Sequence, residues 1–255
     1  MTATAATSAA AARAQHEIEH GRRLAERETD AVWGWGTPAG QLRARRRAAG
    51  IARAAELGPG RRVLEIGCGT GNFTTHFAES GAEILAVDIS PDLLERAQAR
   101  GLPAERVRFA CRRFEDCELD GPFDAVIGSS ILHHLDLDVA LRRIHDLLRP
   151  GGFLSFAEPN LLNPQVLAER KLRGLLPRVF WYVSPDETAF VRWSLARRLR
   201  AAGFVDIRVV PFDWLHPSTP PRLIPLVGAV GRTLEALPLL REFAGSLFIH
   251  ARRPT

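Results

Sequence analysis

The sequence is poor in cysteine and in lysine. Its three cysteines, an odd number without the spacing of a zinc site, exclude a disulfide framework and favour a reducing, cytoplasmic compartment. Lys171 is the only lysine, so the net charge of +5 comes from arginines spread over most helical stretches. The densest cluster, Arg43 with 45–47, is interpreted as a solvated helix face, because charge runs usually are. Nucleic acid is therefore not the expected partner.

No apolar run is long enough to span a membrane, which takes about 18–20 consecutive apolar residues. The most apolar late stretch, residues 223–240, is interrupted by Arg232, Glu235 and two prolines. Residues 1–15 lack the apolar segment of a secretory signal, and their alanine, threonine and serine content predicts a disordered tail. These absences predict a soluble protein without a membrane span.

The 255 residues, 46% hydrophobic and 25% charged, suit one α/β domain. Short apolar runs alternate with helix-like segments, and the runs are largely apolar throughout, as in strands covered on both faces. Because strand–helix–strand repetition produces right-handed crossovers, we expect a doubly wound, seven-stranded, mostly parallel, Rossmann-like sheet. The predicted strands are 63–66, 84–87, 107–109, 125–127, 153–156, 205–210 and 247–251.

Three of the predicted helices have recognisable ends. The first begins after Ser90, a good N-cap, and stops at Gly101, while the second spans about 138–148. Residues 184–187 read as a capping box with proline at the first helical position, and they predict a third helix that ends before Gly203.

Two segments are not needed by this sheet. The domain itself is expected at 61–255, with residues 16–60 as an N-terminal helical cover. Residues 211–246 are proline-rich, apolar and too long for a plain connection, so they are expected to form an insertion. Additions of this kind usually cover the substrate.

A glycine-rich loop, EIGCGTGN at 65–72, follows the first predicted strand. Its glycines allow a tight turn and a close approach of ligand to bare main chain, and the helix start at Asn72 favours an anionic group. Asp88 ends the second strand, where a carboxylate can accept both hydroxyls of an adenosine ribose. No Gly-Lys-Ser/Thr is present, which excludes a P-loop, and Asn72 replaces the third glycine of a dinucleotide fingerprint. The candidate residues in the loop are Glu65, Gly67, Cys68, Gly69, Gly71 and Asn72.

The glycine-rich motif together with Asp88 resembles the nucleotide-binding region of class I S-adenosylmethionine-dependent methyltransferases, in particular the type 11-like small-molecule enzymes. Further landmarks of that family follow in the same order at 123–127, 132–135 and 148–152. The resemblance covers the chain between the first and fifth predicted strands. It implies S-adenosyl-L-methionine as the cofactor.

The resemblance also implies roles for individual residues. The backbone at Gly67 and Gly69, with the helix start at Asn72, would hold the methionine end of the cofactor. Asp88 would bind the ribose hydroxyls, and Ser129 would offer its backbone to the methionine ammonium.

Adenine recognition is the point at which this chain departs from the family. The resemblance places Ile89 beside the adenine, with Phe114 and Glu115 at its edge. The family commonly has Gly-Asp before the position of Phe114, whereas this chain has arginines at 112–113. The usual acid near the adenine amino group is therefore missing unless Glu115 or Asp116 replaces it.

Three residues are candidates for the proton transfer that a hydroxyl or acidic carbon acceptor would need. His133 and His134 follow the fourth strand and face the carboxyl-end crevice, with His134 preferred on helix phase. Glu158, at the end of the fifth strand, is an alternative base or polar anchor. Each of them could equally pack or lock its own loop, so a structural role stays open.

Aromatic residues in the accessory segments are candidates for the acceptor site. Trp33 and Trp35 lie among glycines and predict either a loop that closes over the ligands or a hydrophobic latch for the N-terminal helix. Tyr182 and Trp214 would join them around a large apolar acceptor. The segment from His16 to His20 matches the zinc-peptidase pattern His-Glu-x-x-His, but no third ligand is signalled, so no metal is expected.

The sequence thus predicts a cytoplasmic methyltransferase that moves a methyl group to an O, C or N atom of a small, apolar acceptor, in secondary metabolism. An RNA or tRNA methyltransferase is a first alternative, favoured by the pI near 10.0. A catalytically silent cofactor-binding partner subunit is a second. Whether the chain forms a homodimer stays open.

Overall fold

The computed structural model describes residues 2–26, 32–184 and 187–255. Within these ranges seven strands form one sheet in the order β3-β2-β1-β4-β5-β7-β6. Neighbouring strands are parallel except at β7, which is antiparallel to β5 and β6. The prediction of a doubly wound, mostly parallel sheet is therefore confirmed. The strands are β1 (Arg62–Ile66), β2 (Glu83–Asp88), β3 (Val107–Cys111), β4 (Phe123–Ser129), β5 (Leu148–Pro159), β6 (Val205–Phe212) and β7 (Ser246–Arg252).

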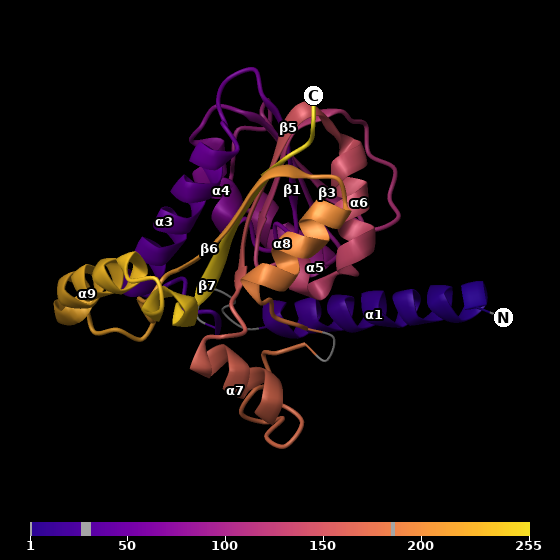
Figure 1. Cartoon of the computed structure of the whole chain (residues 1–255). Coiled ribbons are helices and arrows are strands. Elements are labelled where there is room, and N and C mark those ends of the chain that lie inside the picture. The colour runs from indigo at the N-terminus through magenta and orange to yellow at the C-terminus, as the bar shows by residue number, and fades with distance from the viewer. Residues whose placement is uncertain (1, 27–31, 185–186) are drawn as a thin grey trace.

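Helices cover both faces of this sheet (Figure 1). They are α3 (Pro38–Ala54), α4 (Asn72–Ala78), α5 (Pro91–Gln98), α6 (Leu137–Leu147) and α8 (Arg192–Ala201). Successive residues of a strand point to opposite faces, so Leu64 of β1 packs with α6 and α8 while Val63 packs with α3 and α4. This two-sided burial is the reason why the strands read as continuous apolar runs.

The position of the site follows from the strand order. The order reverses at β1, because β2 lies on one side of it and β4 on the other. The loops that leave β1 and β4 therefore diverge to opposite faces, and a crevice opens at the carboxyl ends of the strands.

Two predicted helices have the expected ends. The Ser90 hydroxyl accepts a hydrogen bond from the Leu93 N–H and caps α5, and Gly101 takes the left-handed φ of +65° beyond its end. The helix expected at 138–148 is α6, in which Asp136 accepts from the Val139 N–H.

The N-terminal segment differs from the prediction of a disordered tail at 1–15. Residues Thr2–Ala25 form helix α1, and Met1 lies outside the described residues. The alanines that suggested low complexity are also the strongest helix formers, and the last turns of α1 pack on α5, where Leu24 is buried. The first turns extend away from the sheet (Figure 1).

The capping box predicted at 184–187 does not start a helix. The Glu187 carboxylate accepts a hydrogen bond from the Ser184 N–H at 2.8 Å, as in a capping box, but α8 begins only at Arg192. Glu187 also forms an ion pair with Arg170, so tertiary contacts override the local signal. Pro185 and Asp186 of this motif lie outside the described residues.

Two helical segments project from the carboxyl-end side of the sheet (Figure 1). After β5 the chain forms α7 (Pro164–Leu172). The insertion between β6 and β7 contains η2 (Pro221–Leu223), α9 (Ile224–Ala236) and η3 (Leu240–Phe243). Among the described helices, none combines the length and the apolar character that crossing a bilayer requires.

Candidate functional site

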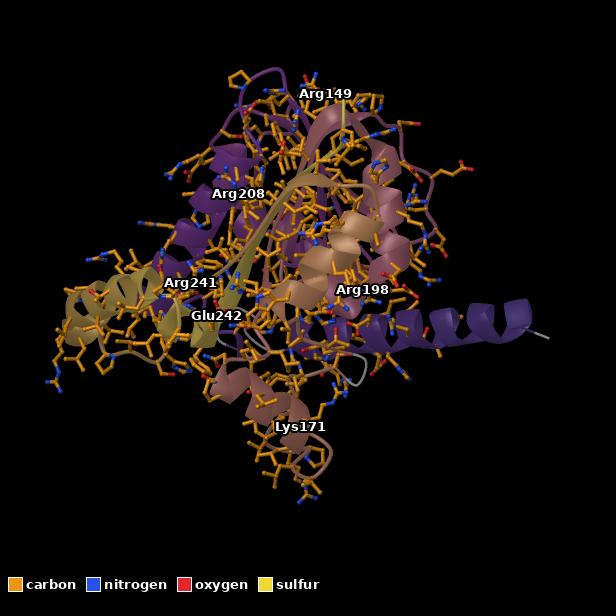
Figure 2. The ribbon with its side chains drawn as sticks, in the orientation of Figure 1. Arg149, Lys171, Arg198, Arg208, Arg241 and Glu242 are labelled. Carbon is orange, nitrogen blue, oxygen red and sulfur yellow. The ribbon has the colours of Figure 1, made fainter. Side chains whose placement is uncertain are left out.

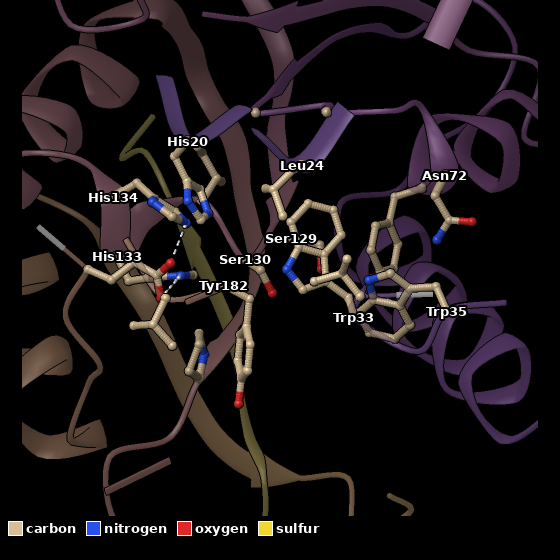
Figure 3. A pocket seen from close by; sticks show the side chains of 18 of the residues that line it. His20, Leu24, Trp33, Trp35, Asn72, Ser129, Ser130, His133, His134 and Tyr182 are labelled. Carbon is tan, nitrogen blue, oxygen red and sulfur yellow. Dashed lines mark ion pairs between the residues drawn. The ribbon is translucent and has the colours of Figure 1, made fainter. Parts of the chain in front are cut away.

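A cavity of about 720 Å³ lies at the carboxyl ends of the strands. Its inner wall consists of the loops that follow β1, β2, β3 and β4. Its outer wall comes from α1, residues 32–37, α7 and residues 213–218 (Figure 3). Residues before the sheet and the start of the segment between β6 and β7 therefore both border the cavity, whereas α9 itself does not line it.

The glycines of the loop after β1 have different tasks. Gly67 and Gly69 both line the cavity and have φ angles of +66° and +51°, in the left-handed region that favours glycine. A Cβ at Gly69 would meet no atom within 4 Å, so this residue borders open space. A Cβ at Gly71 would lie 3.0 Å from the Ala97 Cβ, so the third glycine allows the start of α4 to pack against α5.

Asp88 joins two of the loops. One of its carboxylate oxygens accepts a hydrogen bond from the Gly69 N–H at 2.8 Å, and the other accepts from the Ser90 N–H at 2.9 Å. Burial raises the pKa of Asp88, and these backbone hydrogen bonds oppose that rise. The carboxylate is thus fixed at the end of β2 on the cavity wall, with Ile89 beside it.

Nine of the eleven predicted cofactor residues line the cavity. Glu65 does not: it is buried behind the loop, and this burial raises its pKa to about 8. Gly71 is the second exception. The nine that line the cavity are Gly67, Cys68, Gly69, Asn72, Asp88, Ile89, Phe114, Glu115 and Ser129.

Arg47 is a functional candidate that sequence reasoning missed. It is 3% exposed, and its guanidinium donates to the hydroxyls of Ser129, Ser130 and Ser246. Arg43, one helical turn earlier, donates to the Asp213 carboxylate at 2.8 Å. The interpretation of this arginine cluster as a solvated face is therefore wrong for Arg43 and Arg47. Their i, i+4 spacing on α3 was the available signal, because it places them on one face.

The four aromatic residues predicted for the acceptor site all line the cavity. Trp35 meets the Phe73 ring edge-on at 5.3 Å, and both Arg43 and Arg47 lie over the face of Trp35. The Tyr182 hydroxyl donates to the Glu169 carboxylate at 3.1 Å. Figure 3 shows Tyr182 between the two histidines and the tryptophans. The four residues are Trp33, Trp35, Tyr182 and Trp214.

His133 and Glu158 form a buried pair. The His133 Nδ1 lies 2.6 Å from one Glu158 carboxylate oxygen, and the other oxygen accepts from the Ile131 and Leu132 N–H groups, both at 2.9 Å. Burial and the neighbouring charge of His134 lower the pKa of His133. Glu158 does not line the cavity, so it orients His133 from behind.

His134 has a different partner, and its pKa is raised where that of His133 is lowered. Its Nδ1 lies 2.9 Å from the Glu17 carboxylate of α1, which also accepts from the Ser184 hydroxyl at 2.5 Å. Burial lowers the pKa of His134, but the Glu17 and Glu187 carboxylates outweigh it and raise the value to about 9. Burial raises the pKa of Glu17, but His134 and Ser184 outweigh it and lower the value to about 2. At neutral pH His134 is therefore a cation.

Glu187 faces both histidines. Its carboxylate lies 3.8 Å from the His133 Nε2 and 3.9 Å from the His134 Nε2, and it pairs with Arg170 at 2.7 Å. Among the described residues, these three side chains have ligand atoms within 4.8 Å of one another, a spacing that could suit a metal ion. A metal ion there would have to displace Arg170 and meet a protonated His134, so we interpret the group as a charge network.

The His-Glu-x-x-His pattern of the sequence lies on α1. Its residues Glu17 and His20 line this cavity, while His16 does not.

Known proteins match this arrangement of loop, acid and sheet. Residues 64–154 match the family model of the methyltransferase domain. The demethylmenaquinone methyltransferase of Mycolicibacterium vanbaalenii is 35% identical over 190 residues, which cover 66% of this chain and 78% of that relative. The chain belongs to the class I S-adenosylmethionine-dependent methyltransferases.

Other methyltransferases share parts of the chain or its fold. The ubiquinone biosynthesis O-methyltransferase of Xanthomonas oryzae pv. oryzae is 35% identical over 127 residues, 47% of this chain and 53% of its own. The chain thus spans about half the length of that relative. The N-methyltransferase NodS of Bradyrhizobium japonicum, crystallised with S-adenosyl-L-homocysteine, superposes with a TM-score of 0.63 at 16% identity. That superposition covers 93% of this methyltransferase and 98% of NodS, and it supports the fold.

Three features of the cavity fit S-adenosylmethionine, the cofactor of this family. Gly69 leaves its main chain open to the cavity, which suits close contact with a ligand. Asp88 presents a fixed carboxylate, which suits a pair of hydroxyl donors. The Asn72 side-chain nitrogen is buried on the cavity wall and has no hydrogen-bond partner among the described protein atoms, so a donor is available there.

The Glu17–His134 pair predicts a pH-dependent stability of this methyltransferase. Because its pKa is raised, His134 adds to the free energy of unfolding; this stabilisation is fully present below the ordinary pKa of 6.5 and is lost as the pH rises through about 9. Because its pKa is lowered, Glu17 also stabilises the fold; this stabilisation is fully present above the ordinary pKa of 4.5 and is lost as the pH falls through about 2. We expect Glu17→Gln to lower the melting temperature most between pH 4.5 and 6.5, and progressively less towards pH 9.

Thermal melts over this pH range measure the effect. Glu19→Gln is the matched control, because Glu19 lies on the same helix and its side chain is only half-buried. In the described part of the chain its carboxylate forms an ion pair with the exposed Arg22. A deficit of Glu17→Gln that stays constant from pH 6 to above pH 9 would contradict the protonated state assigned to His134.

Proposed function

We propose that this methyltransferase moves a methyl group from S-adenosylmethionine to a hydroxyl oxygen of a small, apolar acceptor. The observation that carries the proposal is His133, which borders the same cavity as the glycine-rich loop and Asp88 and is held from behind by Glu158. The aromatic lining supports an apolar acceptor. The named relatives, a ubiquinone biosynthesis O-methyltransferase and a demethylmenaquinone methyltransferase, are consistent with a small molecule. Methylation at C or N is the alternative.

The inner wall provides the contacts for the cofactor in this proposal. Gly67, Gly69 and Asn72 hold the methionine end, and Asp88 accepts from the ribose hydroxyls. Ile89 and Phe114 pack against the adenine, and Glu115 lies at its edge. Arg47, held by the Ser129 and Ser130 hydroxyls, supplies a buried cation for the methionine carboxylate.

The outer wall covers the acceptor. We infer that residues 16–60 and the insertion at 211–246 are covers of the domain at 61–255, because α1 and residues 213–218 both line the cavity. They exclude water from the space around the acceptor, which strengthens the electrostatic interactions there.

The sulfonium of the bound cofactor supplies an already activated methyl group. The protein must therefore align the acceptor and remove its proton. Glu158 accepts from the His133 Nδ1–H, which leaves the Nε2 lone pair of a neutral imidazole free to take the hydroxyl proton. His134, cationic beside Glu17, stabilises negative charge that develops on the acceptor oxygen. His133 thus replaces His134 as the preferred base.

Cofactor binding is tested first by thermal stability. At a hundred times its dissociation constant, S-adenosylhomocysteine is expected to stabilise the fold by about 2.7 kcal/mol. For a chain of this size the gain corresponds to a rise in melting temperature of about 5–10 °C. A nicotinamide dinucleotide at the same concentration is the control and should produce no shift. A shift with the dinucleotide alone would remove the assignment.

Acceptor class is tested by transfer of a labelled methyl group. Small phenols and quinols are expected to become labelled, whereas transfer RNA is not. Labelling of RNA with a strong salt dependence would favour the RNA methyltransferase instead. Tight binding of S-adenosylhomocysteine without transfer to either class would favour the silent partner subunit.

A further inference from the structure

The two segments that project beside the cavity expose unusually many large apolar side chains. At the start of α9, Leu223, Leu226 and Val230 follow one another at intervals of three and four residues, which places these three on one helical face. The exposed fraction reaches 77% at Leu175 and 82% at Leu239. The exposed residues are Leu167, Leu172, Leu175, Leu176 and Val179 around α7, and Leu223, Leu226, Val230, Leu237, Leu239, Leu240 and Phe243 around α9.

These segments, residues 164–179 and 221–243, are adjacent; the first lines the cavity, and the second packs behind a residue that lines it. The Asn163 side chain, which caps α7, donates to the Phe243 carbonyl of η3 at 2.9 Å. Val166 of α7 lines the cavity, and Gly231 of α9 packs against Trp214, which also lines it. We call the two segments together the rim surface.

The exposed charged side chains of the rim surface are all basic. Its acids are partly buried, and each has a protein partner: Glu169 accepts from Tyr182, Glu235 pairs with Arg46, and Glu242 pairs with Arg192. The fully exposed charges are basic, namely Lys171, Arg178, Arg222 and Arg232. Figure 2 shows Lys171 of α7 and Arg241 of η3 at this side of the molecule.

We propose that the rim surface docks onto an anionic lipid bilayer, with the leucines inserted between headgroups and the basic residues on the lipid phosphates. Exposed leucines flanked by lysine and arginine are what an interfacial helix needs. A second copy of the chain fits less well, because a symmetric interface would bring the same basic residues together. The docked orientation places the cavity against the bilayer. An apolar acceptor then passes from the lipid into the cavity, a step that rests on the proposed function.

Sedimentation with vesicles tests the docking without any need for turnover. The chain is expected to sediment with vesicles of phosphatidylcholine and phosphatidylglycerol in equal parts, and to stay in solution with phosphatidylcholine alone. Raising the salt concentration should release it, because exposed charges are screened over about 10 Å at 0.1 M salt. Protein that stays in solution with anionic vesicles would overturn the proposal.

Two exposed positions make the test specific. The double variant Leu226→Glu/Leu239→Glu is expected to lower the partition onto anionic vesicles by about tenfold or more, because it removes inserted apolar side chains and adds repelled charge. The matched control is Val205→Glu, which replaces an exposed apolar residue of β6 at the far end of the sheet. Equal partition of the double variant and the wild type would overturn the proposal.

Two further measurements separate the possible explanations. An unchanged thermal shift of the double variant with S-adenosylhomocysteine establishes that its fold and cofactor site are intact. The wild type could instead be a dimer in size-exclusion chromatography and the double variant a monomer, with neither protein binding vesicles. That result would assign the surface to a second copy of the chain and reject docking onto a bilayer. A wild type that binds vesicles but shows no S-adenosylhomocysteine shift would contradict the proposed function and leave the docking intact.

Discussion

Replacing Asp88 by asparagine is expected to raise the dissociation constant of S-adenosylhomocysteine by about 10- to 150-fold. Hydrogen bonds to a charged group contribute about 1.5–3 kcal/mol, and each 1.4 kcal/mol changes an affinity tenfold. The carboxylate is already held by the Gly69 and Ser90 N–H groups, so it meets the ribose in a fixed position. An amide of the same shape keeps one acceptor atom and loses the charge. Titration calorimetry measures the change.

The control for this variant is Glu95→Gln on α5, an exposed carboxylate outside the cavity wall. It should bind S-adenosylhomocysteine as the wild type does. Because Asp88→Asn also alters contacts between two loops, a melt without ligand must accompany the titration. A folded Asp88→Asn protein with unchanged affinity would show that another group holds the ribose.

His133→Gln is expected to lower kcat by about 10²- to 10⁴-fold, the usual contribution of a positioned base. The affinity for S-adenosylhomocysteine should stay unchanged, because the proposed cofactor contacts lie on the glycine-rich loop and Asp88. Glu158→Gln should act in the same direction, since the amide can present its N–H to His133 and favour the wrong tautomer. Steady-state transfer assays with the best phenol or quinol measure both variants.

The pH profile of the wild type provides a second readout. Because burial lowers the pKa of His133, the basic form should persist below the ordinary histidine value of 6.5. His76→Gln on α4 is the control, since that side chain lies outside the cavity wall and pairs only loosely with Glu79. Full activity of a folded His133→Gln protein would refute the base, and a loss confined to His134→Gln would return that role to His134.

Much of the fold could be read from the sequence because the signals are local. The apolar runs gave all seven strands, the ends of α5 followed from Ser90 and Gly101, and α6 lies within one residue of the span predicted at 138–148. The loop at 65–72 and Asp88 were recognisable because the residues that determine a tight turn or the end of a strand are neighbours in the sequence. Five of the seven candidates in this loop and at Asp88 line the cavity.

The local signals were less reliable where tertiary contacts compete with them. The capping box at 184–187 formed its hydrogen bond, but Glu187 also pairs with Arg170 and no helix follows directly. The arginine cluster on α3 looked solvated, yet Arg47 is buried among three serine hydroxyls from distant loops. A sequence window cannot contain partners that lie about 80 to 200 residues away.

The sequence by itself determined the sheet, the glycine-rich loop and the acid that ends β2, because these depend on backbone conformation and on residues close in the chain. Only the tertiary structure decided which histidine is neutral. His133 and His134 are adjacent in sequence, but one meets Glu158 of β5 and the other meets Glu17 of α1. A pKa is set by the burial and charges around a group, and those charges come from segments that only folding brings together.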